Sequence, residues 1–163
     1  MVQFLTIPES EFSKERRKLA RNFADNLLEA YNGVGIPMNE DQALDQSESA
    51  IREVLPNGQQ TKNHFFYYIV NENNKPVGHI WFSIEDEFSG KSAFLYMIYI
   101  NDDERGKSYA HKAMDVLRET VTTKFGIHEI QLNVHAYNKT AIMLYEKLGF
   151  KPLKMTMVLT DTQ

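Results

Sequence analysis

The sequence contains no cysteine, which excludes disulfide bonds, thiolate metal sites and a cysteine nucleophile. It has no internal repeat and no low-complexity linker. It also lacks a long apolar run, since the longest, residues 94–100, is far shorter than the about 20 residues of a membrane-spanning helix. No basic flank and apolar stretch mark a signal peptide at the N-terminus. We therefore expect a cytoplasmic protein without a membrane partner.

An excess of basic residues is absent as well. The chain has 18 Lys and Arg against 22 Asp and Glu, and its formal net charge is -4 at pH 7. Proteins that bind nucleic acids usually present a basic face, so we expect no nucleic-acid partner. The one basic cluster, residues 14–21, has the pattern of the solvated face of a helix. A nucleic-acid-binding domain is the alternative that this cluster leaves open.

The residues that are present indicate one globular domain over 1–163. Hydrophobic residues make up 42% of the chain and charged residues 25%, which is an ordinary balance for a protein with one core. Periodicity, turn residues and helix caps predict the following elements, in order: a strand at 2–6, helices at about 8–33 and 39–55, strands at 64–70, 77–85 and 93–100, a helix at 107–125, a strand at 129–135, a helix at 138–148 and a strand at 150–159. This order predicts an α/β (α+β) fold whose middle strands form an antiparallel meander.

The turn from Arg105 to Ala110 joins a predicted strand to a predicted helix. Such a turn directs unpaired backbone N–H groups at one point, and the helix N-terminus adds a partial positive charge. Arg105 and Lys107 add side-chain charge, and Gly106 allows the backbone to approach a ligand closely. The pattern favours a phosphate site, and the alternative is a surface turn with two solvated cations. The spacing of glycines matches neither a Walker loop nor a Rossmann fingerprint.

A second segment, Asn138 to Phe150, follows about thirty residues later. Asn138 is a good helix N-cap, and Gly149 is a natural stop beyond the last helical turn. Ala141, Leu144, Tyr145 and Leu148 share one face of the intervening helix. Read alone, this segment is an ordinary amphipathic helix with good caps.

Together the two segments resemble the GNAT superfamily, the Gcn5-related N-acetyltransferases. The family's Arg/Gln-x-x-Gly-x-Gly/Ala turn falls here on Arg105, Ser108 and Ala110. Its Asn-x-x-Ala-x-x-Leu-Tyr-x-Lys-x-Gly-Phe helix matches at the following positions: Asn138, Ala141, Leu144, Tyr145, Lys147, Gly149 and Phe150. The resemblance covers roughly residues 64–158, and the strand order fits it.

The resemblance implies a mostly antiparallel central sheet, flanked by helices and splayed between the strands at 93–100 and 129–135. It implies acetyl-CoA as co-substrate. It divides the domain into residues 1–62 on the acceptor side and a cofactor-binding core at 64–158. The cofactor-binding residues that it implies are Ile98, Tyr99, Ile100, Arg105, Gly106, Lys107, Ser108, Tyr109, Ala110, Asn133, Asn138, Ala141 and Tyr145. Backbone N–H groups of Ile98 and Ile100 are the implied oxyanion donors.

Ser108 stands where the family has its middle glycine. A serine there would be strained by on the order of 1 kcal/mol if the position required a positive φ. We expect the position to be helical instead, with the hydroxyl in reach of a phosphate oxygen. The affinity for the cofactor is the property that this departure affects.

Two catalytic roles follow from the chemistry of amine acetylation. An alkyl ammonium, with a pKa of about 10.4, must lose a proton, and the departing thiolate needs a proton donor. The resemblance implies Tyr145 as the general acid, and the alternative is that its ring only packs in the core. Glu85, at the end of a predicted strand, is the proposed base, and the alternative is an acidic hairpin exposed to solvent. The histidines show no ligand spacing, which predicts no metal.

The sequence thus predicts an N-acetyltransferase that moves an acetyl group directly to a primary amine. The acceptor is a small-molecule or peptide amine that no motif identifies. A homodimer is compatible with the resemblance, although no residue pattern indicates an interface. The alternative function is a catalytically weak CoA-binding module that regulates a partner.

Overall fold

The computed structural model of the chain describes residues 1–161. They fall into two compact units, the first made of Met1–Glu11 and Asn57–Asn133 and the second of Phe12–Pro56 and the residues from Val134 onward. This division does not coincide with the expected one at residues 62–64, and the single domain stays a prediction. None of the described helices is long and apolar enough to cross a membrane.

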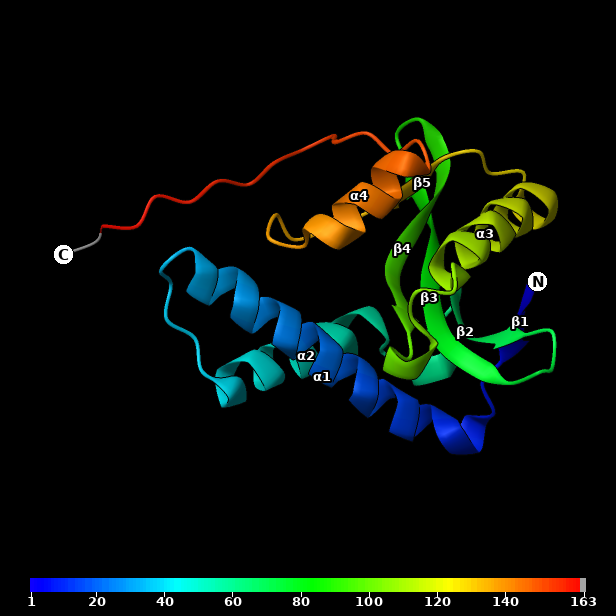
Figure 1. Cartoon of the computed structure of the whole chain (residues 1–163), viewed down its shortest axis with the longest axis horizontal. Helices are drawn as coiled ribbons and strands as arrows, with labels where there is room; N and C mark the ends of the chain where they lie inside the picture. The colour runs from blue at the N-terminus through cyan, green and yellow to red at the C-terminus, as the bar shows by residue number, and fades with distance from the viewer. Residues whose placement is uncertain (162–163) are drawn as a thin grey trace. The chain divides into compact units, whose positions relative to one another are not determined.

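The first unit is built on a five-stranded sheet in the order β1-β2-β3-β4-β5. Its strands are β1 (Val2–Thr6), β2 (His64–Asn71), β3 (Pro76–Glu87), β4 (Gly90–Ile100) and β5 (Ile130–Leu132). The first four pair antiparallel, and β5 runs parallel to β4. Figure 1 labels these strands. The sequence predicted this mixed and mostly antiparallel sheet correctly.

The core of the first unit lies around β3 and the helix α3 (Tyr109–Phe125). The middle strand β3 is buried from Val77 to Ile84 apart from His79, because it has a strand on either side and reads as a nearly continuous apolar run. In α3 the fully buried residues recur at helical spacing, at Ala113, Leu117 and Val121. They place α3 on the sheet, where it contacts β1 and β4.

The sheet changes character halfway along β4. Trp81 pairs with Met97 while the next β3 residue pairs with Leu95, so Tyr96 is an extra residue in a β-bulge. The parallel ladder to β5 ends at the same point, with the pair Leu95 and Leu132, and β4 continues alone on that side. The predicted splay between the two strands is therefore confirmed, and it begins where the bulge turns the strand.

A glycine allows the close approach of β3 to the end of β4. A Cβ atom on Gly78 would lie 2.0 Å from the carbonyl oxygen of Tyr99. We expect Gly78→Ala to lower the free energy of unfolding by about 1–3 kcal/mol, because the two strands must separate. Urea unfolding followed by circular dichroism measures the change. Gly33→Ala is the matched control, since a Cβ there meets no atom, and an equal loss in both variants would contradict the prediction.

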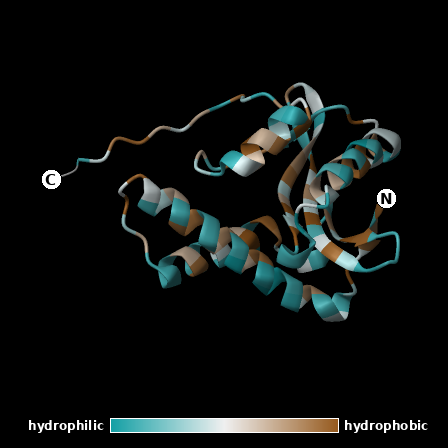
Figure 2. Cartoon of the chain, viewed as in Figure 1, coloured by the Kyte–Doolittle hydropathy of each residue, from teal (hydrophilic) through white to brown (hydrophobic). Residues whose placement is uncertain are grey.

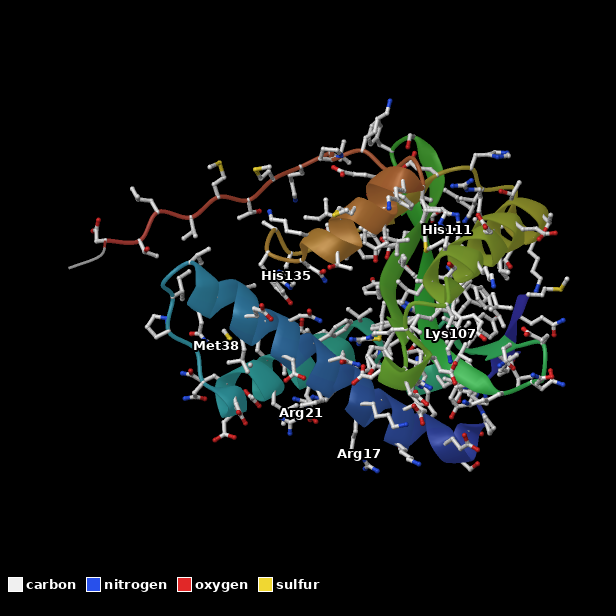
Figure 3. The ribbon with its side chains drawn as sticks, viewed as in Figure 1. Arg17, Arg21, Met38, Lys107, His111 and His135 are labelled. Atoms are coloured by element: carbon white, nitrogen blue, oxygen red, sulfur yellow. The ribbon has the colours of Figure 1, made fainter. Side chains whose placement is uncertain are left out.

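The second unit contains α1 (Glu9–Gly33), α2 (Glu40–Val54) and α4 (Lys139–Lys147), of which α1 starts in the first unit. Arg17 and Arg21 are exposed on α1 (Figure 3), as predicted for the basic cluster. Asn39 caps α2 through a reciprocal pair of hydrogen bonds with Gln42, of 2.9 and 3.0 Å. Two short 3₁₀ turns, η1 (Gly58–Gln60) and η2 (Asp102–Glu104), lie in the first unit.

Two strand predictions were wrong. The strand expected at 129–135 is only β5, residues 130–132, because pairing with β4 stops at the splay. The strand expected at 150–159 is absent, and residues 151–159 are exposed. Alternating apolar residues still run along this segment (Figure 2), but alternation only sets which way side chains face. A strand also needs a second strand for its backbone hydrogen bonds, and no described strand pairs with this segment.

Candidate active site

The turn between β4 and α3 contains two left-handed residues. Gly106 has a φ of 77° and Ser108 a φ of 62°. The expectation that Ser108 is helical was therefore wrong, because α3 begins at Tyr109 and Ser108 lies outside it as the N-cap residue. The chain leaves a 3₁₀ turn at Glu104 and must reverse into the helix within a few residues, which the left-handed positions allow. The hydroxyl of Ser108 makes no capping bond.

This turn presents a row of backbone N–H groups. Within the described part of the chain, residues 106–111 donate no backbone hydrogen bond, and the first to donate is Lys112, to the oxygen of Ser108 at 3.1 Å. Left-handed residues that alternate with ordinary ones curve successive N–H groups into a concave anion site. The positive end of α3 adds to that field. The free N–H groups suit a phosphate group, and the phosphate site itself stays a prediction.

The cationic side chains of the turn are held by carboxylates. Glu104 is only 4% exposed, and its carboxylate accepts hydrogen bonds from Lys75 and, at 2.8 Å, from Lys107. The hydrogen bond to Glu104 raises the pKa of both lysines. Arg105 pairs with Asp102 at 2.8 Å. Glu104 is thus shared by two lysines, of which Lys107 belongs to the turn itself.

Replacing the left-handed Ser108 by glycine tests whether the turn holds this residue under strain. We expect Ser108→Gly to raise the free energy of unfolding by about 1 kcal/mol, because glycine adopts a positive φ without strain. The N–H groups stay in place, so the affinity for CoA, the cofactor that the resemblance implies, should not fall. Urea unfolding and calorimetric titration measure the two quantities. The control is Ser49→Gly inside α2, where the same change should cost about 0.5–1 kcal/mol. A lower free energy of unfolding in both variants would show that Ser108 is unstrained.

The end of β4 carries a second set of free N–H groups. In the first unit, the backbone N–H of Asn101 donates a hydrogen bond of 2.9 Å to the carbonyl oxygen of Val77, so this N–H points towards β3. Because alternate residues of a strand direct their N–H groups to opposite sides, those of Ile98 and Ile100 point away from β3. On that side the pairing with β5 has already ended at Leu95. Among residues 1–161, the splay thus leaves without a strand partner the two N–H groups that the resemblance implies as oxyanion donors.

Glu85 lies on β3 beside the bulge, and its surroundings differ from those of a solvated hairpin. Its Oε1 accepts hydrogen bonds from the hydroxyls of Ser83, at 2.7 Å, and Tyr96, at 3.0 Å. No lysine, arginine or histidine forms an ion pair with it in the described chain, whereas the buried Glu15 and Glu104 both pair with lysine. Glu85 is therefore a half-buried carboxylate that is oriented by two hydroxyls and not neutralised by a cation.

Aromatic side chains surround this carboxylate. Tyr96 stacks on the buried Trp81 with 4.3 Å between ring centroids, and burial together with the charge of Glu85 raises the pKa of Tyr96 to about 12. The Trp81 indole donates to Nδ1 of His64 at 3.1 Å. Burial lowers the pKa of His64, an effect that the charge of Glu85 opposes. The Tyr96 hydroxyl and the His64 imidazole are therefore both uncharged near neutral pH.

Sequence reasoning did not single out His64, Ser83 or Tyr96 as site residues. The alternation of Trp81, Ser83 and Glu85 along β3 was the available signal, since it puts the three on one face. Tyr96 joins them only because the bulge changes the register of β4, and a bulge leaves no mark in the periodicity of this strand. The neighbouring Asp86 is exposed and pairs with Lys91, as expected for the hairpin end.

The remaining predicted residues belong to the segment after β5. Asn133 follows β5 directly and is exposed. In the second unit, the Asn138 side chain accepts from the N–H of Ala141 at 3.1 Å, so the predicted N-cap of α4 is confirmed. Gly149 has a φ of 92°, and Phe150 N–H donates to the Tyr145 oxygen at 2.9 Å, which closes the helix as predicted.

Tyr145 lies on α4, where its ring meets Phe150 edge to face at 5.6 Å. Burial raises the pKa of its hydroxyl, which therefore stays protonated at neutral pH and above. No hydrogen bond of this hydroxyl occurs among the described residues. Among residues 1–161, no group of three or more His, Asp and Glu side chains could hold a metal ion.

Known proteins resemble this chain over most of its length. Residues 25–150 match the Acetyltransferase (GNAT) family. The uncharacterized N-acetyltransferase YdgE of Bacillus subtilis is 31% identical over 149 residues, which cover 91% of each chain. The crystal structure of YycN from Bacillus subtilis, an uncharacterized N-acetyltransferase, superposes with a TM-score of 0.89 and 26% identity over 100% of both chains. An N-alpha-acetyltransferase of Saccharolobus solfataricus is 31% identical over 99 residues, 56% of this chain and 58% of its own. The chain belongs to the GNAT family of acetyltransferases.

Proposed function

We propose that this acetyltransferase transfers the acetyl group of acetyl-CoA directly to a primary amine. The observation that supports this most is the pair of free N–H sets in the first unit, one at the end of β4 and one at the start of α3. The first suits a thioester oxygen and the second a pyrophosphate. Acetyl-CoA supplies an activated acyl group and a thiol leaving group. The chain has no cysteine, which favours direct transfer over an acyl-enzyme.

The residues that would hold acetyl-CoA are those of the turn and its neighbours. In the proposal, the N–H groups of residues 106–111 bind the pyrophosphate, and Arg105 and Lys107 contribute charge once their side chains turn from Asp102 and Glu104. Ile98 and Ile100 donate to the developing oxyanion, with Tyr99 between them. Asn133, Asn138, Ala141 and Tyr145 complete the proposed cofactor-binding set on the strength of the family resemblance.

Glu85 and Tyr145 are the proposed proton carriers. Glu85 takes a proton from the acceptor ammonium, and the lack of a cationic partner in the described chain is what supports this role. The amine nitrogen then bonds to the acetyl carbon while the carbon–sulfur bond breaks. Tyr145 gives its hydroxyl proton to the departing sulfur, and the second proton that the nitrogen loses on becoming an amide returns to the Tyr145 oxygen. The raised pKa of this half-buried hydroxyl supports the role, because the group is protonated at the start of each turnover.

The acceptor class is proposed as a small-molecule amine or a peptide amine. The similarity to the N-alpha-acetyltransferase of Saccharolobus solfataricus supports a peptide amine as the acceptor, although it covers only part of either chain. The unpaired Glu85 favours an acceptor that arrives as a cation, which both choices satisfy. A cytoplasmic location and a metal-free reaction belong to the same proposal.

Release of the CoA thiol in the presence of an amine panel tests the function. The panel holds a polyamine, free amino acids, an aminoglycoside and peptides with free N-termini, each at saturating acetyl-CoA. Thiol release that depends on one amine class, with the acetylated product seen by mass spectrometry, is the expected result. Tight CoA binding without turnover on any amine would instead favour the regulatory CoA-binding module.

A further inference from the structure

The side chain of His64, at the start of β2, is held in a single tautomer. The indole of Trp81 donates to its Nδ1 at 3.1 Å. Because an indole can only donate, Nδ1 accepts, and the one proton of the neutral ring lies on Nε2. A charged ring would carry a second proton on Nδ1, facing the indole N–H, so this contact disfavours the imidazolium. Burial acts in the same direction, because it lowers the pKa of His64.

The protonated Nε2 is a hydrogen-bond donor that the described chain does not use. Within residues 1–161, the bond from Trp81 is the one hydrogen bond of the His64 ring. The ring is half-buried, and the centroids of the Trp81 and Tyr96 rings lie 5.9 and 5.6 Å from its own. An N–H that no protein group accepts is available to a ligand that offers an acceptor atom.

This donor lies beside the proposed base. His64 pairs with Ser83 across β2 and β3, and Glu85 follows two residues later on the same face of β3. Diagonal neighbours of this kind lie roughly 7–8 Å apart, which long side chains can span. Tyr96 connects the two, since its ring lies next to His64 and its hydroxyl donates to Glu85. All four residues belong to the first unit, so their arrangement does not depend on the second.

The carboxylate of Glu85 keeps one oxygen for the acceptor. The hydrogen bonds from Ser83 and Tyr96 both end on Oε1. Oε2 has no hydrogen bond or ion pair within the part of the chain that the structure describes. This face of the sheet therefore offers an anionic oxygen for an ammonium group and, next to it, a neutral N–H for an oxygen atom.

We propose that the Nε2–H of His64 binds a neutral oxygen beside the amine of the acceptor, which selects an α-aminoacyl group, the N-terminus of a peptide. In that group the nitrogen and the carbonyl oxygen lie about 3 Å apart, so one small group reaches both Glu85 and His64. A polyamine has no oxygen for His64. A free amino acid has a carboxylate there, which the charge of Glu85 repels. This role of His64 rests on the proposed function, in which Glu85 takes the proton of the amine.

A matched pair of acceptors tests the selection. Alaninamide carries an amide carbonyl beside its amine, and isopropylamine carries a methyl group in its place. We expect His64→Phe to lower kcat/KM roughly tenfold for alaninamide and to leave it unchanged for isopropylamine, because only alaninamide loses a hydrogen bond. Each amine is compared with itself across the variants, which removes the difference between their pKa values.

Two further variants separate recognition from folding. His64→Gln should recover most of the loss, because its amide can accept from Trp81 and also donate in place of Nε2. His128→Phe changes an exposed histidine between α3 and β5 and should alter neither amine. An equal loss for both amines in His64→Phe, or no loss, would overturn the role of His64. Turnover of a polyamine but of no alaninamide or peptide would overturn it too and leave the proposed function standing. No turnover of any amine would overturn the proposed function, and the role of His64 with it.

The tautomer is measured without turnover. In nitrogen NMR spectra of the protein with isotope-labelled histidine, the His64 signals are those missing from the His64→Phe variant. Near neutral pH they should show a protonated Nε2 and an unprotonated Nδ1. An imidazolium, or a proton on Nδ1 alone, would contradict the assignment of Nε2–H as the donor.

Discussion

Replacing Tyr145 by phenylalanine should lower the turnover number by about 10²–10⁴ with the fold intact. The change removes only the hydroxyl, so the ring keeps its edge-to-face contact with Phe150. The lost group is the proposed donor of a proton to the departing sulfur. Because burial raises its pKa, the wild-type hydroxyl remains protonated through neutral pH, and this group should cause no loss of turnover below about pH 10. Steady-state release of CoA thiol from pH 6 to 10 measures both effects.

Tyr137→Phe is the matched control for this variant. It removes another tyrosine hydroxyl from the second unit, one that donates to the Asn26 side chain. We expect a loss of about 1 kcal/mol in the free energy of unfolding and unchanged turnover, because the hydroxyl is structural. Unchanged turnover in Tyr145→Phe would mean that this ring only packs, which is the alternative that the sequence left open.

Glu85→Gln should also reduce turnover by about 10²–10⁴ at neutral pH. The amide oxygen can still accept from Ser83 and Tyr96, so the substitution removes the charge and the basicity with little change in geometry. An alkyl ammonium has a pKa of about 10.4, so a growing fraction of the acceptor is free amine as the pH rises. The deficit of the variant should therefore shrink towards pH 10. The ratio of wild-type to variant turnover across this range is the measurement.

Asp86→Asn is the control on the adjacent residue. Asp86 is exposed and forms a 2.9 Å ion pair with Lys91, a type of contact that contributes about 0–1 kcal/mol. We expect its turnover to stay at the wild-type level. If the turnover of Glu85→Gln falls by the same small factor at every pH, Glu85 positions Tyr96 or Ser83 and is not the base.

Local features of this chain could be predicted because their causes are local. The caps of α4 depend on Asn138 and Gly149, whose hydrogen bonds and φ act within one helical turn. The Arg105–Ala110 turn was recognised through residue types that neighbour one another. The conformation of Ser108 was not predicted correctly, because serine is found in both helical and left-handed positions and the end of β4 decides between them.

The carboxylate site illustrates a second limit. Glu85 was identified as an acidic residue at a strand end, but its partners come from two strands and a bulge. The position of that bulge depends on how β3 and β4 pair along their whole length. No periodicity within β4 indicates which residue is extra, so Tyr96 could not be assigned to Glu85 in advance.

The sequence by itself determined the order of the elements from β1 to α4, the turn between β4 and α3, the caps of α4 and, through two motifs, the family. These depend on interactions between residues a few positions apart, which the order of residues specifies directly. Only the tertiary structure decided the splay beyond Leu95, the neighbours of Glu85, the left-handed Ser108 and the unpaired residues 151–160. Each of these depends on which distant segment is available as a partner, and a strand pattern forms a strand only where a second strand supplies its hydrogen bonds.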